Sequence, residues 1–203
     1  MSAIHGARFI LIGIYTGTRA GAIATASPDR EQGHSFVDME HGIFYRKAIG
    51  KQTSKKRQPP APVPPRLLAH VRRWQRLQLF AKCFVEFNGK PVASVKKGFW
   101  SGVRLGGLSE VEGKVTPHTL RHTAATWLMQ RAAPLWEAAG FLGMSVDVLE
   151  KNYGHHHPDH MQGAANAIGS KSRFSVVETV VDLESARERR QKALRLLGRS
   201  GRI

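Results

Sequence analysis

The chain has 203 residues, of which 41% are hydrophobic and 23% charged, so it can build the core of one domain and is too apolar for a disordered polymer. Lys and Arg outnumber Asp and Glu by 31 to 15, and the formal net charge of +16 favours a polyanion such as nucleic acid as partner. The single cysteine excludes an intramolecular disulfide and a thiolate metal site, and the longest apolar run near the start, residues 9–14, is too short to cross a membrane. A cytoplasmic protein without membrane association is therefore expected.

The first third of the chain predicts helices followed by a small sheet. Residues 7–26 look helical at both ends, and Thr16-Gly17 is expected to interrupt the helix. Residues 35–38 and 42–46 are short β-favouring runs, whereas the prolines of residues 59–65 fit an edge strand or an extended segment. These runs predict a small antiparallel sheet of about three strands.

A stretch of single-sign charge overlaps this sheet. From His41 to Val85 the sequence contains no acidic residue. A solvated face usually mixes both signs, so the stretch is interpreted as a phosphate-binding surface. Its basic residues are Arg46, Lys47, Lys51, Lys55, Lys56, Arg57, Arg66, Arg72, Arg73, Arg76 and Lys82.

The remaining sequence is mostly helical in pattern. Residues 65–80 have amphipathic periodicity, 84–93 a hairpin signal, and 94–106 predict a helix with Trp100 inward. Thr116 and Pro117 are expected to open a long helix as N-cap and first helical residue. Residues 135–142 and 145–152 predict two short helices, and residues 178–198 a basic amphipathic one. The predicted fold class is mainly α with a small antiparallel β-sheet (α+β).

Three short motifs and one tyrosine follow one another in a specific order. They are Thr16-Gly17-Thr18-Arg19, then His118-Thr119-Leu120-Arg121, then Leu142-Gly143-Met144, and finally Tyr153 nine residues after Met144. Each motif alone arises by chance. In this order and at these separations they resemble the catalytic domain of the tyrosine recombinase (phage integrase) family, and the resemblance covers nearly all of residues 7–160. The expected division is a catalytic domain over 1–170 and a basic C-terminal segment over 171–203.

The resemblance implies site-specific DNA recombination through a 3′-phosphotyrosyl intermediate, with Tyr153 as nucleophile and His118 as its general base. Arg19 and Arg121 would hold the phosphate, because paired guanidiniums make forked hydrogen bonds to its oxygens. A hairpin lysine would protonate the leaving 5′-oxygen; the candidates are Lys51, Lys55 and Lys56, of which Lys55 is preferred and Lys51 also lies in a plausible turn. Lys51, Lys56, Arg57 and His155 are expected DNA contacts, and Met144 stands at a further catalytic position. The implied partners are double-stranded DNA and three further copies of the chain in a tetramer, in a nucleoid-associated setting.

Two positions depart from the family pattern. Met144 stands where the family usually has His or Trp, and a thioether donates no hydrogen bond to phosphate. Ala22 stands where many relatives carry Glu. In addition, nothing in the sequence precedes the first-arginine helix, where the family has a DNA-clamping domain, so weak DNA binding is expected.

These departures leave other functions open. The first alternative is a truncated or degenerate relative that binds DNA without efficient cleavage. An unrelated basic nucleic-acid-binding protein and a type IB topoisomerase-like enzyme are the others. His155-His156-His157 with His160 could suggest a metal site, but no thiolate is near and Pro158 disturbs the spacing. No metal and no cofactor are expected.

Overall fold

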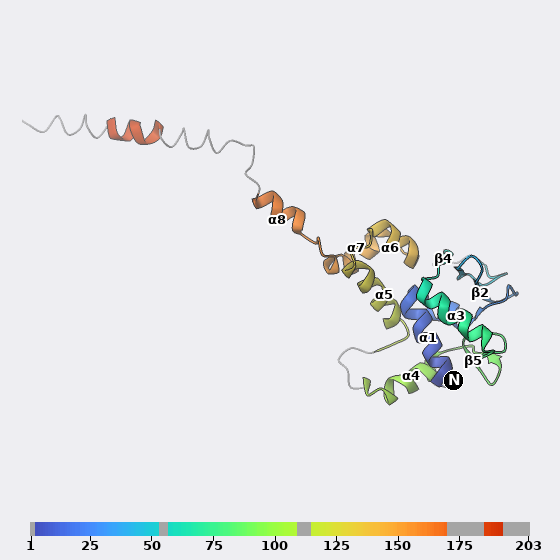
Figure 1. Cartoon of the computed structure of the whole chain (residues 1–203). Coiled ribbons are helices and arrows are strands. Elements are labelled where there is room, and N and C mark those ends of the chain that lie inside the picture. Colours follow the sequence, from blue (N-terminus) through green and yellow to red (C-terminus); the bar gives the residue numbers. More distant parts are fainter. Residues whose placement is uncertain (1–2, 53–56, 109–114, 170–184, 193–203) are drawn as a thin grey trace, which may run out of the picture. The chain divides into compact units, whose positions relative to one another are not determined.

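The computed structural model describes residues 3–52, 57–108, 115–169 and 185–192. The chain divides into two compact units, Met1–His160 and Met161–Ile203 (Figure 1). In the second unit the structure contains α8 (Gln162–Gly169) and a helix over 185–192. The other residues of the helix predicted over 178–198 lie outside the described residues, and the domain boundary after residue 170 stays a prediction.

The first unit opens with the interrupted helix that the sequence predicts. Helix α1 spans Ala3–Thr16 and α2 spans Ala20–Ala24. Between them Gly17 has a φ of +59°, a backbone conformation that glycine adopts without strain. Its N–H still donates to the carbonyl of Gly13 at 2.8 Å, so α1 continues to the turn before the chain changes direction.

The sheet has four strands in the order β1 (Ala26–Ser27), β2 (Ser35–Asp38), β3 (Ile43–Tyr45) and β4 (Ala61–Pro62). Strands β2, β3 and β4 pair antiparallel, which confirms the three predicted strands. Pro62 lies in the edge strand, as its missing N–H requires. The two-residue β1 pairs parallel to β2, so the sheet is mixed and the expectation of a wholly antiparallel sheet is wrong for this strand.

Helix α3 (Pro65–Arg76) follows the sheet and buries Leu67, Val71 and Trp74. Strands β5 (Glu86–Phe87) and β6 (Lys90–Pro91) form the predicted hairpin around Asn88 and Gly89, whose φ values of 50° and 70° are those of a type I′ turn. Helix α4 (Lys96–Leu105) buries Phe99 and Val103, whereas Trp100 is 38% exposed. The expectation that Trp100 points inward is wrong, because Phe99, the residue before it, lies on the buried face of α4.

Three helices complete the unit: α5 (Thr119–Gln130), α6 (Leu135–Leu142) and α7 (Val146–Tyr153), followed by the 3₁₀ turn η2 (Gly154–His156). Helix α5 begins later than predicted, because Thr116–Thr119 form a separate turn in which the Thr119 N–H donates to the Thr116 carbonyl at 2.9 Å. Ser145 caps α7 as predicted, since its hydroxyl accepts from the Val148 N–H.

Buried residues gather in two clusters. The large cluster joins α1, the sheet, α3 and α4, and includes Phe9, Phe44 and Leu67. The small cluster joins α5, α6 and α7, and includes Met129, Leu142 and Tyr153. Helix α5 contributes to both clusters. Leu120 belongs to the large cluster, whereas Ala124, Ala125 and Met129 belong to the small one. The residues that carry the site lie along this junction.

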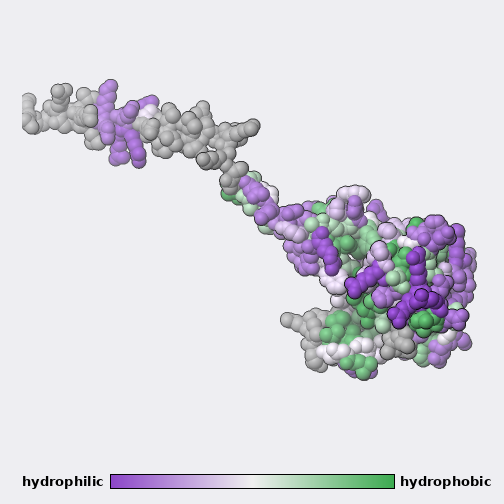
Figure 2. Space-filling model, viewed as in Figure 1, coloured by the Kyte–Doolittle hydropathy of each residue, from purple (hydrophilic) through white to green (hydrophobic). Residues whose placement is uncertain are grey.

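The surface of the first unit is uneven. Hydrophilic side chains cover the side that bears α3, and apolar ones lie over α4 (Figure 2), where Trp100, Leu105 and Leu108 are exposed. Cys83 is fully buried, and burial, with the nearby Glu86 carboxylate, raises the pKa of its thiol to about 11. None of the helices in the described part of the chain has the length and hydrophobicity needed to span a bilayer.

Candidate active site

The turn between α1 and α2 positions Arg19. The Thr16 hydroxyl donates to the Ile12 carbonyl at 2.6 Å, and the Thr18 N–H donates to Thr16 Oγ1 at 3.2 Å. The Thr16 side chain therefore forms hydrogen bonds with backbone groups on both sides of it. A Cβ on Gly17 would lie 2.3 Å from Leu142 Cδ2, which shows how closely the turn approaches α6. Arg19 follows directly and donates from Nη1 to the Arg57 carbonyl at 2.5 Å.

Two buried arginines hold the ends of helices near this turn. Arg121 donates from Nη1 to the Gly17 carbonyl at 2.7 Å. Arg46 donates from Nη2 to the Thr16 carbonyl at 2.8 Å and from Nη1 to the Phe141 carbonyl at 2.5 Å. Helix C-termini carry partial negative charge, so cations are stable there. Arg46 is only 3% exposed, and its interpretation as part of an exposed phosphate-binding surface is therefore wrong.

The three arginines concentrate positive charge. Burial and neighbouring Arg19 lower the pKa of Arg121 to about 10. Burial, followed by Arg121 and Arg19, lowers the pKa of Arg46 to about 10 as well. Within residues 3–52, 57–108 and 115–160, no Asp or Glu carboxylate forms an ion pair with any of the three. A cation cluster paired only with carbonyls attracts an anion, since repulsion among the cations falls when one binds.

The Tyr153 hydroxyl lies beside this cluster. Tyr153 is the last residue of α7 and is 8% exposed. Its hydroxyl oxygen lies 2.5 Å from Nδ1 of His122. Burial raises the pKa of Tyr153, and the positive charge of Arg121 partly opposes that rise. The candidate nucleophile and the candidate phosphate-binding residue Arg121 are thus brought together in one unit.

The sequence motifs assign no catalytic role to His122. The available signal was its spacing, since His118 and His122 are four residues apart and share one face of a helix. In the structure their rings meet edge-on with centroids 4.7 Å apart. Burial, together with His122, Arg121 and Arg19, lowers the pKa of His118, so its neutral form is favoured.

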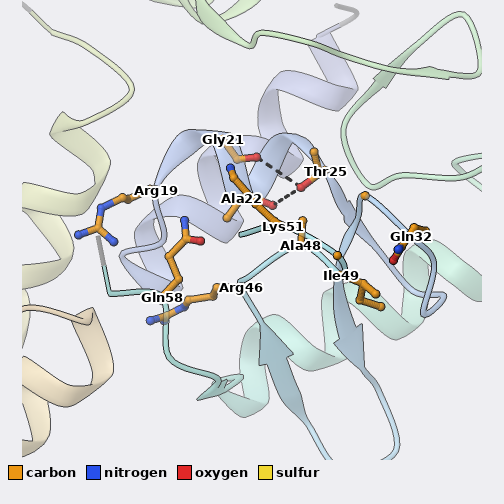
Figure 3. Close-up of a pocket in the computed structure, with 12 residues that line it drawn as sticks. Arg19, Gly21, Ala22, Thr25, Gln32, Arg46, Ala48, Ile49, Lys51 and Gln58 are labelled. Atoms are coloured by element: carbon orange, nitrogen blue, oxygen red, sulfur yellow. Dashed lines mark hydrogen bonds between the residues drawn. The ribbon is translucent and has the colours of Figure 1, made fainter. Parts of the chain in front are cut away.

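The segment after β3 opens onto a pocket of about 590 Å³. Arg19, Arg46, Lys51 and Gln58 line it, together with Ala22 from α2. Figure 3 shows Arg19, Gln58 and Arg46 at one end of this pocket and Lys51 alongside α2. Of the other basic side chains predicted here, Arg57 is exposed, and Lys55 and Lys56 lie outside the described residues.

Gly143 and Met144 end α6 in a Schellman motif. Gly143 has a φ of +68°, the Met144 N–H donates to the Ala139 carbonyl at 3.0 Å, and the Gly143 N–H donates to the Gly140 carbonyl at 3.1 Å. The half-buried Met144 side chain packs against the small cluster. The position therefore serves packing and offers no side-chain hydrogen-bond donor.

The histidines after Tyr153 do not gather into a metal site. His155 is exposed, and its ring contacts that of His156 at a tilt of 46°, with centroids 3.9 Å apart. The described residues contain no group of three or more His, Cys, Asp or Glu side chains that could hold a metal ion.

No protein-family profile and no curated protein sequence matches this chain. Solved structures match its fold. The Tn1549 transposon integrase in complex with transposon right end DNA aligns with a TM-score of 0.59 and 16% identity, over 82% of this chain and 59% of that one. XerA recombinase aligns with a TM-score of 0.51 and 18% identity, over 85% and 65%. XerH site-specific recombinase bound to palindromic difH substrate aligns with a TM-score of 0.56 and 20% identity, over 84% and 48%.

The chain thus spans between about half and two thirds of the length of these structures. The TM-scores of 0.51–0.59 establish a shared fold, and at identities of 16–20% the likeness extends to the fold alone. The α+β class predicted from the sequence is confirmed, and the fold is the one shared with the Tn1549 integrase, XerA and XerH.

Proposed function

We propose, from the tyrosine recombinase fold of this chain, that it cleaves and rejoins duplex DNA at specific sites through a phosphotyrosyl intermediate. One observation supports this most directly. Tyr153 lies within electrostatic reach of Arg121, which belongs to a cluster of three arginines that no described carboxylate neutralises. A phosphodiester is an anion with an electrophilic centre, and such a site binds the charge and attacks the phosphorus.

The proposed reaction needs no external energy source. Arg19 and Arg121 hold the two non-bridging oxygens and stabilise the charge that builds up in the transition state. Tyr153 Oη forms a bond to phosphorus, the bond from phosphorus to the 5′-oxygen breaks, and a 5′-hydroxyl is released. The 3′-phosphotyrosyl ester conserves the bond energy, so the 5′-hydroxyl of another strand reverses the step and joins the new partner.

The leaving 5′-oxygen needs a proton, and we propose that Lys51 supplies it. Lys51 lines the same pocket as Arg19, which supports this role; Lys55, the residue preferred from sequence, lies outside the described residues. Lys56, Arg57 and His155 remain proposed DNA contacts. Exchange between two duplexes requires four cleavages, so we further propose a tetramer on DNA, bound within the nucleoid.

A nicked suicide duplex tests the function. After cleavage the short 5′-hydroxyl strand diffuses away and the covalent protein–DNA adduct accumulates. The wild-type chain should form the adduct, and Tyr153→Phe, which removes only the hydroxyl, should form none. Detection is by denaturing gel and mass spectrometry of the modified peptide. An adduct that persists in Tyr153→Phe would contradict the nucleophile assignment.

The same duplex with sulfur in place of the bridging 5′-oxygen tests Lys51. A thiolate leaves without protonation, so the sulfur substrate should restore cleavage by Lys51→Ala but not by Tyr153→Phe. Lys55→Ala serves as the matched comparison. If the sulfur restores Lys55→Ala instead, Lys55 is the acid.

A second candidate function is DNA binding without efficient cleavage. Met144 favours this second function, because its side chain packs against the small cluster and has no donor for a hydrogen bond to phosphate. Retained DNA binding in a mobility-shift assay, with no adduct from the wild-type chain, would support this function over recombination.

A further inference from the structure

The hydrogen bond of Tyr153 joins two helices that approach each other at the active site. His122 lies in the first turns of α5 and Tyr153 at the end of α7. The distance of 2.5 Å between Tyr153 Oη and His122 Nδ1 is short for an O–H···N contact. Among the described residues, this is the hydrogen bond that the Tyr153 hydroxyl forms.

The direction of the bond follows from the chemistry of the two groups. A phenol whose ionisation is suppressed by burial keeps its proton and donates it. His122 must then accept at Nδ1 and carry its own proton on Nε2. A ring nitrogen that accepts the phenolic hydrogen bond is already placed to take the proton.

His118 is in a different position. Its ring meets that of His122 edge-on, and Arg121 and Arg19 are its charged neighbours. In the proposed reaction His118 is then left to donate a ring N–H to a phosphate oxygen. In the part of the chain that the structure describes, His122 is the hydrogen-bond partner of the reacting oxygen of Tyr153.

We propose that His122, through Nδ1, is the general base that deprotonates Tyr153 as it attacks DNA. The inference rests on the proposed function and moves the base role from His118 to the residue four positions later. In the step, the proton passes from Tyr153 Oη to His122 Nδ1 and the phenolate oxygen bonds to phosphorus. The bond from phosphorus to the 5′-oxygen breaks, and the leaving oxygen takes a proton from the general acid. In the reverse step His122 returns its proton to the tyrosine.

Single-turnover cleavage of the nicked duplex tests the proposal. His122→Ala should slow adduct formation by roughly 10²- to 10⁴-fold, the range typical of a general base. His122→Gln, which keeps a hydrogen-bonding side chain but no basic nitrogen, should be comparably slow. His160→Ala, an exposed histidine elsewhere in the unit, should cleave like the wild-type chain.

Added imidazoles separate a base from a residue that only orients the tyrosine. His122 is exposed, so a small molecule can occupy the space left by His122→Ala. The rate of that variant should rise with imidazole concentration and with the basicity of substituted imidazoles. A sulfur-bridged substrate should not restore the rate, because the defect lies in the nucleophile.

The outcomes are distinct. An active wild-type chain with His122→Ala within threefold of it would overturn the base assignment alone. A slow His122→Ala that no imidazole accelerates would also overturn it, in favour of an orienting role. Absence of any adduct from the wild-type chain would overturn the proposed function and this inference together.

Discussion

The two buried clusters of the unit Met1–His160 carry different parts of the candidate active site. The large cluster, with the sheet and the long N-terminal helix, supports Arg19, Arg46 and the segment that contains Lys51. The small cluster of three helices supports Met144 and Tyr153, the proposed nucleophile. The large cluster thus supports basic residues of the site, and the small cluster supports the residue proposed to form the covalent bond.

Hydrogen bonds from two arginines cross the junction between the clusters. Arg46 reaches from the sheet side to the Phe141 carbonyl, and Arg121 reaches from α5 to the Gly17 carbonyl. Gly17 and Gly143 add close contacts with Leu142 and Pro59. Guanidinium–carbonyl bonds therefore hold together the two halves of the site, and the same cations create its positive potential.

Replacing Arg46 should have the largest effect on stability. Arg46→Met removes hydrogen bonds to two helix-terminal carbonyls and leaves them buried, so the free energy of unfolding should fall by about 3 kcal/mol. Arg19→Met, which loses one hydrogen bond at a partly exposed site, should lose less than about 1 kcal/mol. Urea denaturation measures both. Equal losses would show that Arg46 does not join the two clusters.

A smaller loss of stability is expected when Gly17 is replaced. In Gly17→Ala the φ of +59° costs about 1 kcal/mol, and the overlap with Leu142 adds about 1–2 kcal/mol, because Leu142 is fully buried and cannot move aside. Gly33→Ala is the matched control, since Gly33 has a φ of +80° but open space around it. Thermal unfolding should separate the two variants. If they melt together, the close approach of the turn to α6 contributes nothing.

The smallest change in free energy is expected at Met144, which packs against the small cluster, and it concerns the rate of cleavage and not stability. Met144→His places a ring N–H near the phosphate and should raise the rate of adduct formation about tenfold, equivalent to about 1.4 kcal/mol. Met144→Leu, which keeps the packing and adds no donor, should leave the rate unchanged. A rate for Met144→His that equals that of Met144→Leu would show that this position does not reach the phosphate.

Local signals predicted much of this fold correctly. The interruption at Gly17, the cap at Ser145 and the turn at Asn88-Gly89 depend on the conformations of a few adjacent residues, and all three are confirmed. The inward side of α4 was missed, because Phe99 and Trp100 are both large and apolar. Composition does not distinguish two such neighbours; the packing of the core does.

The site was less predictable than the fold. Motif order located Arg19, Arg121 and Tyr153, and the structure brings them together. The role of Arg46 depends on carbonyls 30 and 95 residues away in sequence, and such partners leave no mark on the local pattern. The contact between His122 and Tyr153 likewise depends on how α5 and α7 cross, which the spacing within either helix does not determine.

The burial of Cys83 has a practical consequence. Its thiol is covered and stays protonated, whereas alkylating reagents react with an exposed thiolate. The unmodified chain should therefore be nearly inert to maleimide dyes. A cysteine introduced at an exposed residue such as Gln52, in the segment beside Lys51, would be the one position that takes up a fluorophore. Such a probe would report when that segment meets DNA, without any prior removal of native cysteines.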